Sequence, residues 1–337
     1  MTSTTRMQSC IIVGLCALIA LTALSVLQGS TTIPLRAVGD AFLLWFYQGE
    51  NHLGPVYSIV IDLRLPRALL AMMVGAGLGI VGVLLQTTTR NDLADPFLFG
   101  LSAGAAAGAV AVITIGSNLL GIWTLPAAAF IGGMTASALV IALVRQMSDS
   151  GPEKLILAGL AVSFIFTALT NYLIFSGDQR AAHSVLFWSL GGLGLARWDN
   201  LWLAFLGFIA VFGYALYHHR NFDALLAGEQ TAYTLGVDPI KLRNLTFVIC
   251  AFSTAIFVSL TGIIGFIGLM VPHIARTLTG ALHKKLILLS ALLGSLILLG
   301  SDLVARIILT PQELPLGIVT TSVGGLFVFF LLTKSSR

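Results

Sequence analysis

Residues 265–276 read GFIGLMVPHIAR and lie inside a long apolar region of the sequence. Two glycines, a proline, a histidine and an arginine within these twelve residues are unusual for a segment that faces lipid. The hydrocarbon layer tolerates such residues only where protein or a water-filled path surrounds the chain. The segment therefore predicts a membrane protein whose interior contains short or broken helices.

The composition indicates a polytopic α-helical membrane protein. Of the 337 residues, 57% are hydrophobic and only 9% are charged, whereas soluble domains carry about 25% charged residues. The apolar runs are continuous and long, while a membrane β-barrel would show alternating segments of roughly ten residues. We therefore expect an all-α fold in a single transmembrane domain, residues 1–337.

Ten segments have the length and composition of membrane spans, given that a span needs about 20 apolar residues. They cover residues 10–28, 57–88, 96–116, 124–145, 154–176, 199–218, 242–262, 265–279, 286–309 and 314–333. The first run exceeds the roughly 7–15 apolar residues of a signal peptide, so we expect a retained span. The apolar stretch 41–47 is too short to span and is expected to lie along the surface.

Two of the ten segments are short. From Gly265 to Arg276 a helix rises only about 18 Å, against a hydrocarbon core of about 30 Å, and we expect Pro272 to end or kink it near the inner face. The third segment, DPFLFGLSAGAAAGAV, is also short and rich in Gly and Ala. Its FLFGL and the later GFIGL hint at an internal repeat, and paired Gly-interrupted segments point to a transport pathway.

The distribution of basic residues predicts the orientation. With the N-terminus inside, twelve Lys and Arg residues fall in inner segments and six in outer segments, and all five lysines are inside. Because cytoplasmic loops carry an excess of Lys and Arg, both termini are predicted to be cytoplasmic.

Several kinds of chemistry are absent from the sequence. It contains no GxxxxGK[ST], HExxH or GxSxG motif and no Cys/His cluster, so we predict no catalytic residue, no metal site and no cofactor bound by this chain. No basic run exceeds the pair Lys284–Lys285, so no nucleic-acid partner is expected.

The acidic residues argue against a self-powered carrier. Nearly all lie in loops or at span ends, whereas ion-coupled carriers generally need an intramembrane carboxylate. Asp302 is the best candidate, but Arg306 follows at i+4, so we expect a local ion pair. His273 has no potential ligand nearby in sequence, and we expect it to have a structural, hydrogen-bonding role.

The longest inner connection, residues 218–244, predicts two short amphipathic helices. Glycines at 228 and 236 divide it and Pro239 closes it. Its apolar residues recur at near-helical spacing: Phe222, Leu225, Leu226, Tyr233 and Leu235. Such a face packs on its own protein or docks on a partner.

Three arginines are expected at the outer surface. Arg64 and Arg67 lie one helical turn apart at the start of the second span, and Arg306 ends the ninth. Single arginines there are interfacial anchors. As a cluster they would suit an acidic protein partner, because Arg pairs with carboxylates in a bidentate manner.

Along nearly its whole length the sequence resembles the FecCD-type family, the permease subunits of ABC importers for iron chelates and vitamin B12. The matching stretches, in order, are LRLPRALLAMMVGAGLGIVGVLLQ, RNDLADPFLFGLSAGAAAGA, LILAGLAV, LLAGEQTAYTLGV, GFIGLMVPHIAR, SDLVAR and ELPLGIVTTSVGG. The resemblance implies a type II ABC importer permease fold with ten spans in the bacterial inner membrane. It also implies a second permease subunit (we favour a homodimer), two cytoplasmic ATPases that bind Mg-ATP, and a periplasmic or lipid-anchored substrate-binding protein.

The resemblance also assigns roles to residues of this chain. Residues 222–236 are similar to coupling helices that dock on the ATPase, and the assigned positions are Phe222, Leu225, Leu226, Ala227, Gly228, Glu229, Ala232, Leu235 and Gly236. Arg64, Arg67 and Arg306 match arginines that meet the binding protein. Asn91, Leu93, Pro152 and Glu153 match the cytoplasmic gate. Asp92 stands where the family often has proline, which puts the geometry of this loop in question.

The sequence leaves the substrate open. A wide path with few charges fits ferric siderophores, haem and cobalamin alike. We favour an iron chelate, with cobalamin as the alternative and an ion-coupled secondary transporter as a more distant one.

Overall fold

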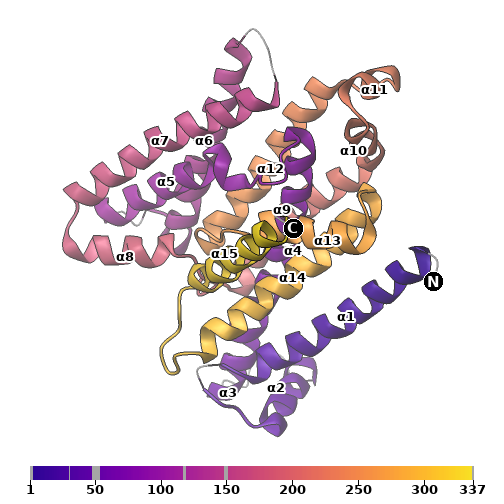
Figure 1. Cartoon of the computed structure of the whole chain (residues 1–337). Coiled ribbons are helices and arrows are strands. Elements are labelled where there is room, and N and C mark those ends of the chain that lie inside the picture. The colour runs from indigo at the N-terminus through magenta and orange to yellow at the C-terminus, as the bar shows by residue number, and fades with distance from the viewer. Residues whose placement is uncertain (1–2, 30, 48–53, 117–118, 148–150, 336–337) are drawn as a thin grey trace.

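The computed structural model describes residues 3–29, 31–47, 54–116, 119–147 and 151–335. Within these ranges every regular element is a helix (Figure 1). The all-α prediction is therefore confirmed.

Eight helices in the described ranges are long and apolar enough to cross a membrane. They are α1 (Ser3–Leu27), α4 (Leu65–Thr89) with the preceding α3 (Pro55–Tyr57) and η2 (Ser58–Arg64), α6 (Thr124–Gln146), α7 (Pro152–Ser176), α9 (Trp198–Tyr217), α12 (Pro239–Thr261), α14 (His283–Ile307) and α15 (Leu316–Ser335). Two shorter helices, α5 (Leu101–Ile115) and α13 (Ile267–Thr279), correspond to the two segments that the sequence marks as short. Each of the ten predicted segments is thus a helix.

The remaining helices lie toward the ends of the bundle. One end carries α10 (His219–Leu226) and α11 (Glu229–Thr234), which confirms the two predicted short helices (Figure 1). Away from them lie α2 (Leu35–Tyr47), which contains the short stretch 41–47, and α8 (Gln179–Ser189). The sequence analysis missed α8, although Asp178 caps it by accepting a hydrogen bond from the Ala181 N–H.

Helix α4 forms the centre of the bundle. Every residue from Val74 to Thr89 is buried, and α4 packs against α9, α12, α13 and α14. Its glycines permit the close approach: a Cβ at Gly75 would lie 2.3 Å from the Gly294 carbonyl oxygen of α14, and one at Gly82 would lie 1.9 Å from the Gly268 oxygen of α13. The glycines of α4 therefore allow α13 and α14 to pack closely against it.

Two outcomes were expected at Pro272, an end or a kink of α13, and the first of them is wrong. The helix continues through Pro272 to Thr279. A proline inside a helix leaves the carbonyl four residues earlier without its usual donor, which here is the carbonyl of Gly268. Gln86 of α4 supplies that donor, because its Nε2 lies 3.3 Å from the carbonyl oxygens of Gly268 and Leu269. A partner helix thus satisfies the freed carbonyl and the helix persists.

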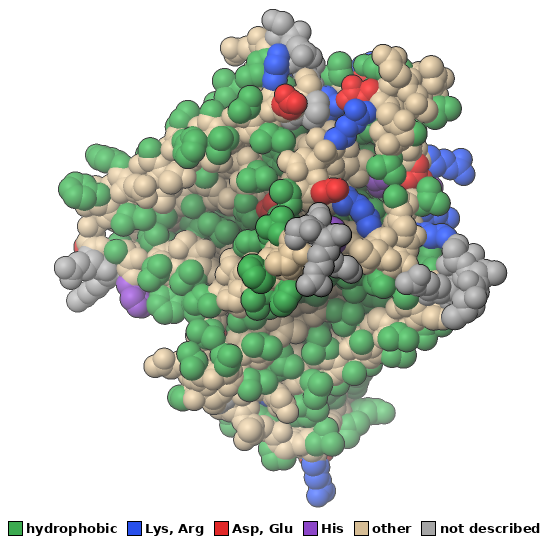
Figure 2. Space-filling model, viewed as in Figure 1, with side chains coloured by type: hydrophobic (Ala, Val, Ile, Leu, Met, Phe, Trp, Pro, Cys, Tyr) green, Lys and Arg blue, Asp and Glu red, His purple; other side chains and the backbone are tan. Residues whose placement is uncertain are grey.

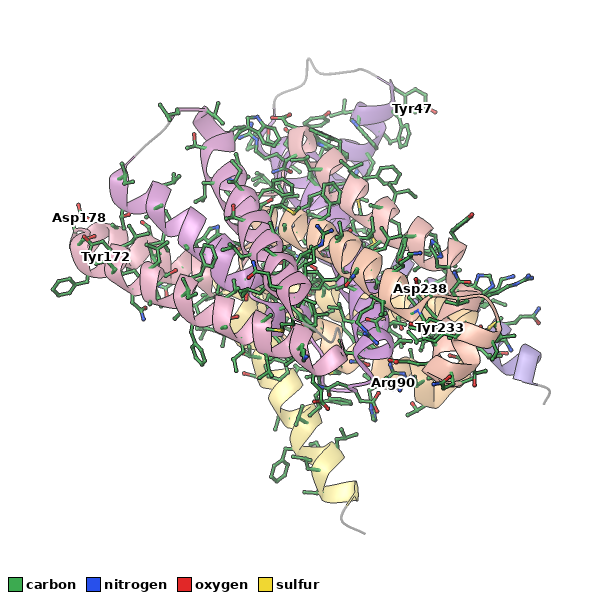
Figure 3. All side chains as sticks on the ribbon, turned by 90° about the horizontal axis from the view of Figure 1, so that it is seen from above. Tyr47, Arg90, Tyr172, Asp178, Tyr233 and Asp238 are labelled. Atoms are coloured by element: carbon green, nitrogen blue, oxygen red, sulfur yellow. The ribbon has the colours of Figure 1, made fainter. Side chains whose placement is uncertain are left out.

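The surface separates apolar and charged regions. Figure 2 shows hydrophobic side chains over the middle and lower parts of this face, with most of the visible charges gathered above and to the right. In the view from above, Arg90, Tyr233 and Asp238 lie together on one side, and Tyr172 and Asp178 lie on the other (Figure 3). The α10–α11 region is therefore the charged end of a bundle with an apolar middle.

Candidate functional site

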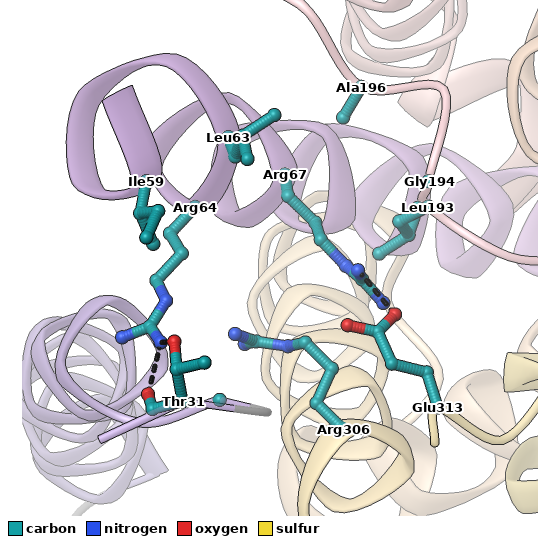
Figure 4. A pocket seen from close by; sticks show the side chains of 11 residues that line it. Thr31, Ile59, Leu63, Arg64, Arg67, Leu193, Gly194, Ala196, Arg306 and Glu313 are labelled. Carbon is teal, nitrogen blue, oxygen red and sulfur yellow. Dashed lines mark hydrogen bonds and ion pairs between the residues drawn. The ribbon is translucent and has the colours of Figure 1, made fainter. Parts of the chain in front are cut away.

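The predicted site residues fall into two regions. Arg64, Arg67 and Arg306, here called the arginine cluster, surround a cavity of ≈ 270 Å³ (Figure 4). At the other region, α10 and α11 lie near the segment 90–95 that joins α4 to the short helix η3 (Pro96–Phe99). We call this segment the α4–η3 loop.

Arg67 bridges two carboxylates. Its Nε lies 2.9 Å from Oδ1 of Asp302, and its Nη1 lies 2.8 Å from Oε2 of Glu313. Asp302 is fully buried, whereas the Glu313 side chain is 39% exposed. Arg67 therefore joins the buried and the solvent-facing parts of the cluster.

Arg64 and Arg306 bind the C-terminal end of α1. The last carbonyls of a helix have no partner within the helix. Here Arg64 Nη1 donates to the carbonyl oxygens of Val26 and Leu27, at 2.9 and 2.8 Å, and Arg306 Nη1 donates to that of Ser25, at 3.0 Å. Two arginines distant in sequence thus cap one helix end.

Asp302 is paired on both sides. Its Oδ2 accepts from Arg306 Nε at 2.9 Å, which confirms the local ion pair expected from the i+4 spacing, and its Oδ1 accepts from Arg67. A carboxylate held by two cations is poorly suited to take up and release a coupling ion. Counting the whole cluster, three arginines face two carboxylates, which leaves one positive charge in excess.

The three arginines differ in exposure and in their partners. Arg64 and Arg306 are only 6% and 3% exposed, and their hydrogen bonds are to the protein itself. Arg67 has a side chain 15% exposed. These internal partners could not be predicted from the sequence, because the acceptors are backbone carbonyls and every residue has one.

Helices α10 and α11 each have a buried and an exposed side. Phe222, Leu225 and Ala232 are buried and anchor the pair to the bundle. The other assigned positions are more accessible: Leu226, Ala227, Gly228, Glu229, Leu235 and Gly236. Leu226 is 54% and Leu235 65% exposed, and Tyr233, which the assignment left out, is 49% exposed. These three residues, here called the apolar patch, are the exposed large apolar side chains of α10 and α11.

The α4–η3 loop is fixed by its own side chains. Arg90, in the left-handed conformation at φ 51°, ends α4, and the Asn91 side chain accepts from the Leu93 N–H at 2.9 Å. Leu93 itself is 53% exposed. Asp92 accepts from Arg276 of α13 at 3.0 Å, so the aspartate that replaces the family's usual proline ties the loop to α13.

Asp95 closes the loop with a buried carboxyl group. Its Oδ1 accepts from the Phe97 N–H at 3.0 Å, while its Oδ2 has no hydrogen-bond partner among the described residues. Burial raises the pKa of Asp95 to about 6, and the bond from Phe97 only partly offsets this. Sequence analysis did not single out this residue.

The other two assigned gate residues begin α7. Glu153 is exposed in the first turn, and the placement of the Pro152 side chain lies outside what the structure describes. Helix η3 packs against α7, where a Cβ at Gly159 would lie 2.7 Å from the Leu98 carbonyl oxygen. The structure therefore brings the α4–η3 segment and α7 together.

Helix α7 also carries an exposed face that the sequence analysis did not assign. Leu160, Phe164, Thr167 and Asn171 follow helical spacing and are all exposed. Polar side chains within a span face other protein or a water-filled cavity rather than lipid. This face is thus a candidate lining for a path or for a contact with another subunit.

Two further predictions concern metal ligands, of which none was expected, and the role of His273. In the described ranges, no group of three or more His, Cys, Asp or Glu residues could hold a metal ion. The His273 ring packs edge-on against Phe327 of α15, with ring centroids 5.5 Å apart. Its contact is therefore aromatic, where we expected a hydrogen bond.

Comparison with known proteins gives consistent matches. Residues 17–334 match the FecCD transport family. An iron chelatin transport system permease protein from Helicobacter pylori is 37% identical over 287 residues, covering 85% of this chain and 86% of that protein. The cobalamin import system permease protein BtuC of Halobacterium salinarum is also 37% identical, over 92% of this chain and 82% of that protein. A solved metal-chelate type ABC transporter in an inward-facing conformation superimposes with a TM-score of 0.84 at 28% identity, covering 96% of this chain and 98% of that chain.

Proposed function

The chain belongs to the FecCD transport family, and from this premise we propose that it carries an iron chelate across the bacterial inner membrane by alternating access. It is a polytopic ABC transporter permease, a transport subunit for iron chelates or vitamin B12. We propose that the substrate is an iron chelate and that residues 1–337 form a single transmembrane domain. The assembly with other subunits is also our proposal.

The observation that carries the proposal is the apolar patch of Leu226, Tyr233 and Leu235. It lies on α10 and α11, which stand at one end of the bundle (Figure 1). An exposed apolar patch surrounded by polar residues is typical of a protein docking site. We propose that a separate cytoplasmic ATPase, one on each of two permease subunits, docks there and supplies the energy from Mg-ATP.

This placement sets the orientation of the proposed transporter. The α10–α11 end and both termini face the cytoplasm, and the arginine cluster faces outward. The excess positive charge of the cluster favours an acidic surface on a periplasmic or lipid-anchored binding protein. Because Arg64 and Arg306 are engaged with α1, we propose that they act through the field of the cluster and that Arg67 makes the direct contact.

The gate and the path follow from the same arrangement. We propose that Asn91 and Leu93, with Pro152 and Glu153 at the start of α7, close the path on the cytoplasmic side. The exposed face of α7, with Thr167 and Asn171, would line the path between this chain and a second, identical permease. Uncharged polar groups on such a face suit a large chelate that must pass without binding tightly.

Cobalamin is the second candidate substrate. Its support is the relative from Halobacterium salinarum, which matches this chain at the same identity as the iron chelatin permease. An ion-coupled carrier has less support, because the one buried intramembrane carboxylate singled out from the sequence, Asp302, is paired with two arginines.

The test is uptake into proteoliposomes that contain this chain, its ATPase and its binding protein. Ferric siderophore, haem and cobalamin are supplied in parallel, with and without Mg-ATP inside. We expect ATP-dependent accumulation of an iron chelate. Accumulation of cobalamin alone would replace the substrate, and uptake that ignores ATP but follows an ion gradient would overturn the importer assignment.

A further inference from the structure

The last turn of α4 is connected to both short helices through side chains of α14 and α12. This turn, Gln86–Thr89, is fully buried and leads directly into the α4–η3 loop. Between the loop and α10 lies a cavity of ≈ 370 Å³, lined in part by Thr87, Asp92, Leu225 and His283. Side chains from two other helices span this region and join it to α10 and α11.

The first connection runs from α10 through His283. His283, the first residue of α14, is 1% exposed. Its Nδ1 lies 2.7 Å from Oδ1 of Asp223 on α10, and its backbone N–H donates to the same oxygen at 2.8 Å. Its Nε2 lies 2.8 Å from the Thr87 hydroxyl of α4. With a neutral ring, Nδ1–H donates to the carboxylate and Nε2 can accept the Thr87 hydroxyl proton, whose other acceptor is the Val83 carbonyl oxygen of its own helix at 2.9 Å.

The second connection runs from α11 through Arg243. Glu229, the first residue of α11, pairs through Oε1 with Arg243 Nη2 at 2.7 Å. Arg243, on α12, donates from Nε to the Thr88 carbonyl oxygen at 3.1 Å. That carbonyl is among the last four of α4, which no helical N–H reaches. Thr88 thus accepts from a side chain whose other partner is on α11.

Aromatic contacts fix the position of α10 relative to His283. Phe222 is buried, and its ring lies 5.5 Å from the His283 ring and 6.1 Å from that of Tyr214, measured between centroids. Aromatic packing of this kind fixes ring orientation as well as distance. A displacement of α10 would therefore move Phe222, Asp223 and His283 together.

We propose that the contacts Asp223–His283–Thr87 and Glu229–Arg243–Thr88 form a two-branch linkage that transmits movement of α10 and α11 to the α4–η3 loop. The inference rests on the proposed function, in which the ATPase moves these helices. The His283 and Arg243 side chains are both buried. If α10 and α11 moved while α4 stayed in place, a buried polar group would lose its partner, which is costly. The end of α4 follows instead, and with it the loop that carries Asn91 and Leu93. His283 and Arg243 are positioning residues and touch neither ATP nor substrate.

The chain offers a matched pair of variants. Thr87→Val keeps the shape of a buried β-branched side chain but removes the hydroxyl that meets His283. Thr89→Val makes the same change two residues later, where the hydroxyl donates only to the Leu85 carbonyl of its own helix, at 2.7 Å. Both residues are buried, at 7% and 4% exposure, so their stability costs should be similar. Thr87→Ser restores a hydroxyl and serves as the rescue variant.

The measurement is the number of chelate molecules transported per ATP hydrolysed, in proteoliposomes with the complete transporter. Transmission between sites is commonly worth at least about fivefold, so we expect Thr87→Val to lower this ratio about fivefold with the ATPase rate retained. Thr89→Val should match wild type, and Thr87→Ser should recover most of the loss. Glu229→Gln weakens the second branch and should also lower the transport ratio. When it is combined with Thr87→Val, the ratio should fall by more than the product of the two single effects.

Two failures are distinguishable. If wild type transports with ATP but Thr87→Val and Thr89→Val give the same ratio, the linkage is overturned and the proposed function stands. If wild type shows no ATP-dependent uptake, the proposed function fails and the linkage fails with it. Should Thr87→Val unfold, Glu229→Gln alone decides, because Glu229 lies at the surface and an unchanged ratio in that variant would overturn the proposal.

Discussion

The arginine cluster and the α4–η3 loop lie toward opposite ends of the bundle and treat buried charge in opposite ways. In the cluster, Asp302 accepts from two arginines, and the arginines also cap α1. In the loop, the buried Asp95 has an oxygen without a hydrogen-bond partner in the described part of the chain. A fully paired network resists rearrangement, whereas a buried carboxylate with one oxygen unpaired makes its conformation less stable than it could be.

The backbone follows the same division. The two non-glycine residues with positive φ in the described ranges are Arg90, at 51°, and Phe266, at 70°. The first begins the α4–η3 loop, and the second immediately precedes α13, which Asp92 contacts through Arg276. Strained residues are commonly found at switch regions. Under the proposed function, the cluster would act as a fixed support and the loop as a part that changes conformation.

The largest expected effect comes from breaking the fixed end. Arg306→Ala would leave Asp302 with one of its two cations and would remove the donor to the Ser25 carbonyl, while Arg64 would still bind the carbonyls of Val26 and Leu27. Removing one partner of a buried ion pair typically costs about 3–5 kcal/mol. We therefore expect the free energy of unfolding to fall by about that amount, as measured by thermal unfolding of the purified protein. Arg197→Ala is the control, because its pair with Asp199 is more than half exposed and is worth less than about 1 kcal/mol. Equal effects of the two variants would contradict the fixed support.

A substitution in the α4–η3 loop is expected to raise the free energy of unfolding, by a smaller amount. In the folded protein the pKa of Asp95 is raised to about 6 from 3.8, so ionisation costs stability above pH 6, and stability returns as the pH falls from about 6 toward 4. Two pKa units correspond to on the order of 3 kcal/mol. Asp95→Asn keeps an acceptor for the Phe97 N–H and removes the charge, so it should stabilise the protein at pH 7.5 and about half as much at pH 5.

Thermal unfolding of Asp95→Asn and wild type across this pH range tests the assignment. The two curves should converge as the pH falls. A constant difference at all pH values would show that Asp95 does not titrate in this window. If the loop must change conformation during transport, the stabilised variant should also transport more slowly at neutral pH, although its fold is intact.

Sequence reasoning reached the helices but not the connections between them. Hydrophobic run lengths located all ten long segments, and the spacing of Phe222, Leu225 and Leu226 predicted that α10 is amphipathic. The linkage could not be read in this way, because Asp223 and His283 are sixty residues apart and Arg243 meets Thr88 across 155. Arg64 and Arg306 bind backbone carbonyls, which carry no sequence signature. The expected helix end at Pro272 did not take Gln86 into account, because Gln86 is 182 residues away from Gly268.

The smallest predicted effect concerns the one solvent-facing carboxylate of the arginine cluster. Glu313 is 39% exposed and pairs with Arg67, so Glu313→Gln should change stability by less than about 1 kcal/mol. It raises the excess positive charge of the cluster from one to two and frees part of Arg67. If this end meets an acidic partner, association with the binding protein should tighten roughly two- to threefold at low ionic strength.

Salt separates this effect from a change of shape. Screening shortens the Debye length from about 10 Å at 0.1 M to about 3 Å at 1 M, so the gain from Glu313→Gln should fade as salt is added. Asp40→Asn, which removes an exposed carboxylate from α2 outside the cluster, should give a smaller gain. Binding that weakens in Glu313→Gln at low salt would mean that the pair with Arg67 positions the arginine for its partner. The cluster would then act through geometry, and the fixed support would extend to the surface of the molecule.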